Sequence, residues 1–176
     1  ILYGIVPGIV KVGGWFELLF VNTFSMPFNT GLIIYIVVLA GMLVWSIWET
    51  YAAKSKARTN IAFILVIALT GLPFYGHGVT CVVLGLIVLG ALAAYLFNLD
   101  KLKEQWRISA RVMSTALVSI LMIVVGYSSY AVIVVRSAAN TPMDQNSPED
   151  IFTLGTYLNR EQYGTRPLFW GQGFDS

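Results

Sequence analysis

A small set of carboxylates and arginines has the side-chain chemistry to move a group from a phosphate to a hydroxyl. Such a transfer needs a general base for the acceptor and positive charge for the departing phosphate. The carboxylate candidates are Glu17, Asp144, Glu149 and Asp150, and the arginine candidates are Arg136, Arg160 and Arg166. We select Glu17, Asp144 and Arg160 as substrate-binding candidates, while the residues alone identify no catalytic acid.

Several of these candidates also have a structural explanation. Glu17 is the only charged residue in the apolar segment 15–20, where a lone acid costs free energy unless it is paired or solvated. Two interpretations of Glu17 stay open: it contacts a substrate, or it pairs with Lys11 or faces water. Arg160 fits an ordinary helix-surface charge, and Arg136 fits a side chain that snorkels at the membrane edge.

No metal centre or cofactor is predicted. His77 is the only histidine and stands between two glycines, and Cys81 is the only cysteine and lies in an apolar run. A metal site needs several His, Cys or carboxylate ligands close together. We therefore interpret His77 as an exposed loop residue and Cys81 as a small buried hydrophobe.

Four apolar runs must position the polar residues. They cover about residues 30–48, 60–75, 79–97 and 112–135, and they contain no Lys, Arg, Asp or Glu. Because a helix rises about 1.5 Å per residue, about 20 apolar residues cross a hydrocarbon core of about 30 Å. The chain is also 57% hydrophobic and only 11% charged, unlike a soluble domain. The sequence therefore predicts an all-α polytopic membrane protein with four full transmembrane helices.

The ends of the chain extend this prediction. Residues 1–12 have the character of a truncated span that Gly13 and Gly14 break, so the membrane region covers residues 1–135. Residues 136–176 are expected to begin an α/β extracytoplasmic domain. Because the chain opens at Ile1 inside an apolar stretch, we expect it to be a fragment of a longer membrane protein.

Basic residues predict the orientation of the spans. They concentrate in two loops, one after the first run and one after the third. These residues are Lys54, Lys56 and Arg58 in the first loop and Lys101, Lys103, Arg107 and Arg111 in the second. Both loops share one side if all four runs span, and the positive-inside rule makes that side the cytoplasm. The C-terminal tail is then extracytoplasmic, and the net charge of only +2 supports no nucleic-acid partner.

Two segments within this layout need separate treatment. Residues 98–111 predict an amphipathic helix on the inner leaflet, which serves either as a simple anchor or in the recognition of anionic lipid. Residues 60–97 must hold two spans and a turn, with Pro73 near the end of the first. We expect a thin, tilted or re-entrant hairpin there, and the charge pattern favours the spanning pair.

The polar tail predicts a helix followed by a strand. Ser147 is the expected N-cap, with Pro148 at the first helical position and Glu149 near the positive end of the helix dipole. Gly164 is the expected helix stop, and residues 166–170 predict a short extended segment. This order indicates the opening of a soluble extracytoplasmic domain.

Four stretches of the chain resemble a known family. They are GWFELLFVN (14–22), GYSSY (126–130), NTPMDQNSPED (140–150) and YLNREQYG (157–164). They resemble a family of multi-spanning bacterial membrane proteins that is catalogued as a domain of unknown function. That family is related to the animal transmembrane O-mannosyltransferase that modifies plexin-type receptor domains, and the resemblance covers essentially the whole chain.

The resemblance implies a GT-C-like glycosyltransferase in a bacterial inner membrane. Such enzymes take a sugar from a lipid-phosphate donor at the outer face, and the acceptor implied here is a hydroxyl of an exported protein. The implied partners are therefore membrane lipid, the lipid-linked sugar and the protein acceptor. The family's acidic residue usually lies in the first outer loop, which we expect upstream of this chain, so the fragment alone is expected to be inactive.

A membrane transporter or flippase, or a non-catalytic membrane scaffold, is the alternative. Ion-coupled transporters place ionisable groups near the bilayer midplane. The four apolar runs contain none, which counts against coupling through these helices.

Overall fold

The computed structural model describes residues 4–52, 55–75, 78–98, 108–139 and 147–159. Within these ranges all regular structure is helical, which confirms the predicted all-α character. The helices are α1 (Ile5–Phe24), α2 (Thr30–Ala52), α3 (Lys56–Leu69), the short 3-10 helix η1 (Leu72–Phe74), α4 (Val79–Phe97), α5 (Ala110–Tyr127), α6 (Tyr130–Ala138) and α7 (Ile151–Asn159). The predicted strand at 166–170, the helix stop at Gly164 and most of the amphipathic helix at 98–111 lie outside the described residues.

Four of the described helical stretches are long and apolar enough to cross a membrane. They are α1, α2, α4 and the run Ala110–Ser137, which joins α5 and α6. Three of them correspond to the predicted spans at 30–48, 79–97 and 112–135. The chain is therefore an integral membrane protein, although the identity of the fourth long helix differs from the prediction.

The predicted break at Gly13 and Gly14 is wrong, because α1 runs without interruption from Ile5 to Phe24. Glycine inside a helix costs about 1 kcal/mol relative to alanine, but here it allows a second helix to approach. A Cβ on Gly13 would lie 2.5 Å from Cδ1 of Ile151, and one on Gly14 would lie 3.1 Å from Cε1 of Phe152. The pair is thus a packing surface for α7, as small residues are in membrane helices.

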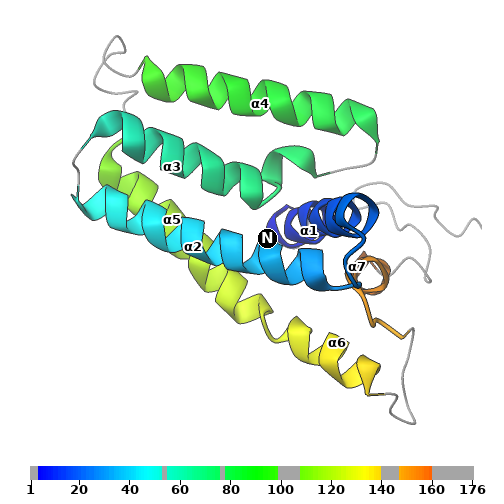
Figure 1. Ribbon diagram of the computed structural model, residues 1–176. Coiled ribbons are helices and arrows are strands. Elements are labelled where there is room, and N and C mark those ends of the chain that lie inside the picture. Colours follow the sequence, from blue (N-terminus) through cyan, green and yellow to red (C-terminus); the bar gives the residue numbers. More distant parts are fainter. Residues whose placement is uncertain (1–3, 53–54, 76–77, 99–107, 140–146, 160–176) are drawn as a thin grey trace, which may run out of the picture.

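The predicted span at 60–75 is not one continuous helix. Helix α3 ends at Leu69 after 14 residues, a length of about 21 Å, and η1 follows it. Gly71 adopts a left-handed conformation with φ of 72°, which turns the chain between the two helices. The expected hairpin is nevertheless present, because α3 and α4 lie side by side and run in opposite directions (Figure 1).

Three of the described basic residues gather at one end of the bundle. Helices α2 and α4 finish there, and α3 and α5 begin there (Figure 1). Lys56 and Arg58 in the first turn of α3 and Arg111 in the first turn of α5 share this position. We call it the basic end, and the end where α2 begins the opposite end.

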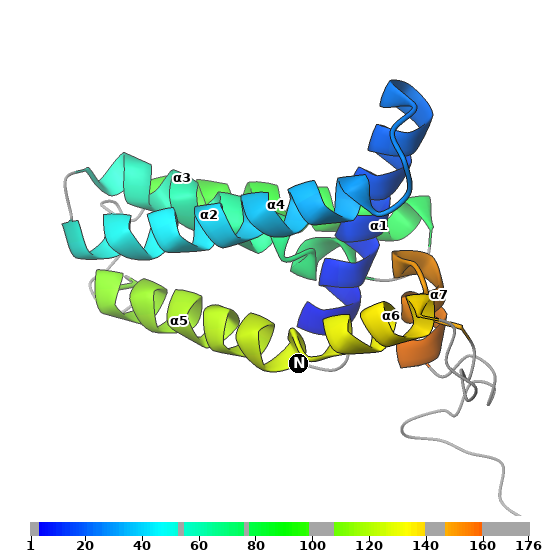
Figure 2. The ribbon, with the colours of Figure 1, turned by 60° about the horizontal axis from the view of Figure 1, so that its bottom comes forward.

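Helix α1 does not run alongside the others. Figures 1 and 2 together show it crossing α2 at a steep angle near the opposite end of the bundle. Backbones come very close at its crossing with α2, where a Cβ on Gly31 would lie 2.6 Å from Cα of Glu17. Helix α7 packs on α1, so the start of the polar tail joins the bundle at this crossing.

Polar side chains inside the bundle satisfy carbonyl groups at helix ends. The Tyr35 hydroxyl is fully buried and donates to the carbonyl oxygen of Leu69 at 2.5 Å, at the last residue of α3. The Asn60 amide donates to the carbonyl oxygen of Leu96 at 2.9 Å, near the end of α4. Terminal carbonyls have no partner within their own helix, so these two bonds connect α2 to α3 and α3 to α4.

The N-cap of α7 differs from the prediction. Asp150, not Ser147, caps this helix, because its Oδ1 accepts the N–H groups of Phe152 at 2.9 Å and Thr153 at 2.8 Å. Ser147 adopts a positive φ of 37° outside the helix, and Pro148 is buried in the connection. A carboxylate at this position both accepts the orphan N–H groups and favours the positive end of the helix dipole.

Candidate functional site

Glu17 lies at the crossing of α1 and α2 with only 1% of its surface exposed. One carboxylate oxygen accepts the N–H of Asn29 at 2.5 Å, and the other accepts the N–H of Leu32 at 2.8 Å. The interpretation that Glu17 faces water is therefore wrong. Its carboxylate instead holds the start of α2.

This arrangement resembles a capping box contributed by another helix. In a capping box, two side chains of one helix satisfy the N–H of the N-cap residue and of the third helical residue. Here these residues are Asn29 and Leu32, and the two oxygens of Glu17 accept both N–H groups from α1. The negative charge also lies at the positive end of the α2 dipole. Gly31 lies between Asn29 and Leu32, and it lacks the Cβ that would push the backbones of α1 and α2 apart.

The other two substrate-binding candidates, Asp144 and Arg160, lie outside the described residues. The structure therefore does not test whether they approach Glu17, and their contact with substrate stays a prediction. Substrate binding by Glu17 also stays a prediction. A substrate would have to bind a carboxylate that already accepts two backbone N–H groups.

A second buried acid was missed by sequence reasoning. Glu49 lies near the basic end of α2 with none of its surface exposed, and its Oε2 accepts a hydrogen bond from Arg58 of α3 at 3.1 Å. Its Oε1 and the hydroxyl of the fully buried Ser46 have no hydrogen-bond partner among the described residues. The sequence does carry a signal for a buried polar cluster, because Ser46, Glu49 and Thr50 are spaced three and four residues apart at the end of an apolar run and so share one face of a helix.

These side chains define what the described part of the chain can do chemically. Glu49 and Ser46 offer two buried oxygens about one helical turn apart, which suit a small hydrogen-bond donor such as water. No group of three or more His, Cys, Asp or Glu residues gathers in the described ranges. The two buried acids lie at opposite ends of α2, so they do not form a carboxylate pair.

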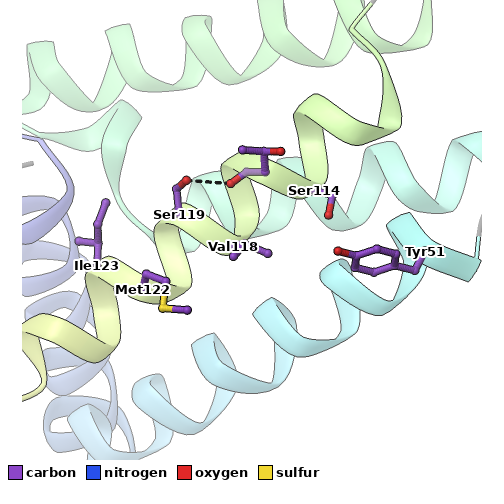
Figure 3. Close-up of a pocket in the computed structure, with 7 residues that line it drawn as sticks. Tyr51, Ser114, Val118, Ser119, Met122 and Ile123 are labelled. Atoms are coloured by element: carbon purple, nitrogen blue, oxygen red, sulfur yellow. Dashed lines mark hydrogen bonds between the residues drawn. The ribbon is translucent and has the colours of Figure 1, made fainter.

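A groove runs along the lipid-accessible side of α2 and α5 from the basic end. Two adjacent hollows of about 480 and 400 Å³ share Tyr51, Ser114 and Thr115, so they form one groove. The other lining residues are Thr50, Ala110 and Arg111 at the basic end, and Val118, Ser119, Met122 and Ile123 further along α5. Figure 3 shows the Tyr51 ring of α2 lying toward Ser114 of α5. We call this the α2–α5 groove.

The hydroxyl groups of α5 are partly engaged within their own helix. Thr115 donates to the carbonyl oxygen of Arg111 at 2.9 Å, and Ser119 donates to that of Thr115 at 2.8 Å (Figure 3). Such bonds let a hydroxyl lie in an apolar environment. They leave the hydroxyl oxygens with lone pairs facing the groove.

Comparisons with known proteins add no assignment. No protein-family model matches the chain, and searches of curated proteins and of solved structures found no match either.

Proposed function

We propose that this chain is part of a GT-C-like membrane glycosyltransferase of a bacterial inner membrane. It would move a sugar from a lipid-phosphate donor to a hydroxyl of an exported protein at the extracytoplasmic face. The resemblance of the four sequence stretches suggests this activity. The structural observation that supports it is the packing of α7 on α1, which brings the start of the polar tail to the end of the bundle opposite the basic end.

The position of Glu49 counts against ion-coupled transport through α2. Such transporters hold ionisable groups near the bilayer midplane. In the described part of the chain, Glu49 lies close to the basic end of α2, and Glu17 lies at the opposite end of that helix. Glu49 is therefore not midway along α2, whereas Glu17, although it lies at the start of α2, is the thirteenth of the twenty residues of α1.

The orientation can be tested by cysteine labelling of the full-length protein in a Cys81→Ser background. Under the proposal, Thr156→Cys on α7 reacts with a membrane-impermeant maleimide in spheroplasts. Lys56→Cys at the basic end reacts only after the membrane is permeabilised, because the positive-inside rule puts it in the cytoplasm. Labelling of Lys56→Cys in intact spheroplasts would reverse the orientation.

Deletion of the full-length gene tests the activity. We expect a defined sugar to disappear from Ser or Thr sites of exported proteins, measured by glycopeptide mass spectrometry, and to return when the gene is restored. An unchanged glycoproteome would remove protein O-glycosylation and leave lipid or polysaccharide glycosylation, transport or a scaffold function.

Variants of the restored gene test the site residues. We expect Asp144→Asn and Arg160→Gln each to reduce transfer at least about tenfold, the effect of losing a charged group that contacts substrate. Glu149→Gln is the matched control, because Glu149 is an exposed carboxylate in the same tail and should leave transfer unchanged. Equal activity in all three variants would remove Asp144 and Arg160 from the site.

A further inference from the structure

We propose that the α2–α5 groove binds an anionic phospholipid from the leaflet at the basic end. Its phosphate would lie at Arg111, and one acyl chain would follow α5 toward Ile123. This site is independent of the proposed glycosyl transfer, which takes place at the other face of the membrane.

The lining of the groove changes from polar to apolar along its length. At its mouth, Arg111 and the Tyr51 hydroxyl provide the charged and neutral donors that a phosphate accepts, while the Thr50 hydroxyl already donates to the carbonyl oxygen of Ile47. Further along α5, Val118 and Met122 provide an apolar wall. This order matches the order of headgroup and acyl chain in a phospholipid.

The length of the groove also fits a single leaflet. Arg111 and Ile123 lie near the two ends of the groove lining along α5, and the twelve residues from one to the other rise about 18 Å. Half of a hydrocarbon core of about 30 Å is about 15 Å. A phosphate at Arg111 therefore lies near the membrane surface, while an acyl chain reaches the neighbourhood of Ile123 near the midplane.

The charges at the mouth favour an anionic over a zwitterionic lipid. Arg111 is exposed, and Lys56 and Arg58 lie at the same end of the bundle. Among the described residues, Glu49 is the only acid at this end, and it is buried against Arg58. The local field is therefore positive, which attracts anionic headgroups at a membrane surface.

The test compares lipids retained by the full-length protein. The protein is reconstituted with equal parts of phosphatidylglycerol and phosphatidylcholine that carry identical acyl chains, and the lipids that stay bound on detergent extraction are counted by native mass spectrometry. We expect a preference for phosphatidylglycerol. Arg111→Gln should lower the ratio of retained phosphatidylglycerol to phosphatidylcholine about fivefold, the contribution of one basic residue at an anionic surface.

Two further variants separate a specific site from general attraction. Arg136→Gln removes the same charge from the other end of the α5–α6 run, outside the groove, and should lower the ratio less than Arg111→Gln does. Met122→Trp should displace the acyl chain without disturbing the core, because Met122 lines the groove and is 66% exposed, and phosphatidylglycerol retention should fall. The proposal is overturned if the parent protein shows no preference, if Arg111→Gln and Arg136→Gln act equally, or if Met122→Trp retains the lipid.

Discussion

Glu17→Ala is expected to lower the free energy of unfolding by about 3 kcal/mol. The substitution removes the acceptor for the N–H groups of Asn29 and Leu32, which lie at the start of α2. Each buried donor left without a partner costs about 1–3 kcal/mol, and the loss of a charge at the positive end of the helix dipole adds to this. The measurement is the midpoint of unfolding of the full-length protein in micelles titrated with dodecyl sulfate, followed by circular dichroism.

Two controls show whether the cap is the cause. Glu17→Gln retains one acceptor oxygen, so it should lose about half as much stability as Glu17→Ala. Glu149→Ala removes a carboxylate that is exposed and should change the midpoint little. If Glu17→Ala unfolds at the same midpoint as the parent protein, the two hydrogen bonds do not hold α1 to α2.

The outcome also bears on the proposed substrate role of Glu17. A carboxylate that acts only as a cap should affect stability, and activity only through the folded fraction. If Glu17→Gln keeps most of its stability but loses transfer, then Glu17 also takes part in substrate binding. The two roles are therefore separated by measuring stability and activity on the same variant.

Gly85→Ala is expected to destabilise the packing of α4 on η1 by about 2 kcal/mol. A Cβ on Gly85 would lie 2.6 Å from the carbonyl carbon of Pro73, and closer still to its oxygen. Because these are backbone atoms, α4 and η1 must move apart. Overpacking of this kind costs about 1–3 kcal/mol. The change from glycine to alanine also gains about 1 kcal/mol of helix propensity. Because the clash here is with backbone atoms, we expect a cost in the upper part of the overpacking range, which leaves a net loss of stability.

Gly90→Ala on the same helix is the matched control. A Cβ on Gly90 would meet nothing within 4 Å, so only the helix propensity changes, and the midpoint should stay the same or rise slightly. Both variants are measured in the same dodecyl sulfate titration. Equal shifts for Gly85→Ala and Gly90→Ala would show that the close approach to Pro73 does not limit stability.

Much of the membrane architecture followed from local pattern. Uninterrupted apolar runs predicted α2, α4 and the α5–α6 run, because crossing a hydrocarbon core requires length and the absence of charge, and both are visible in a sequence. The charge pattern likewise placed the two basic loops together, and the described residues Lys56, Arg58 and Arg111 do share one end of the bundle. Such properties belong to single segments and need no knowledge of their neighbours.

Some predictions failed because of contacts between segments, and the N-cap of α7 failed for a local reason. Gly13 and Gly14 suggested a helix break by propensity, but their lack of a side chain serves the approach of α7. Ser147 was a plausible cap by position, whereas Asp150 makes the hydrogen bonds. Intrinsic propensities are about 1 kcal/mol or less for most residues, so tertiary packing readily overrides them.

The sequence by itself determined that this protein lies in a membrane, that it is helical, and that Lys56, Arg58 and Arg111 share one end of the bundle, because hydrophobicity and charge act along the chain. Only the tertiary structure decided what the buried polar groups do. Glu17 and Glu49 are both charged residues beside apolar runs, and their neighbours in the sequence do not distinguish the role of one from that of the other. Folding places the first on the start of α2 and the second against Arg58, since a buried carboxylate is stable only where the fold supplies donors.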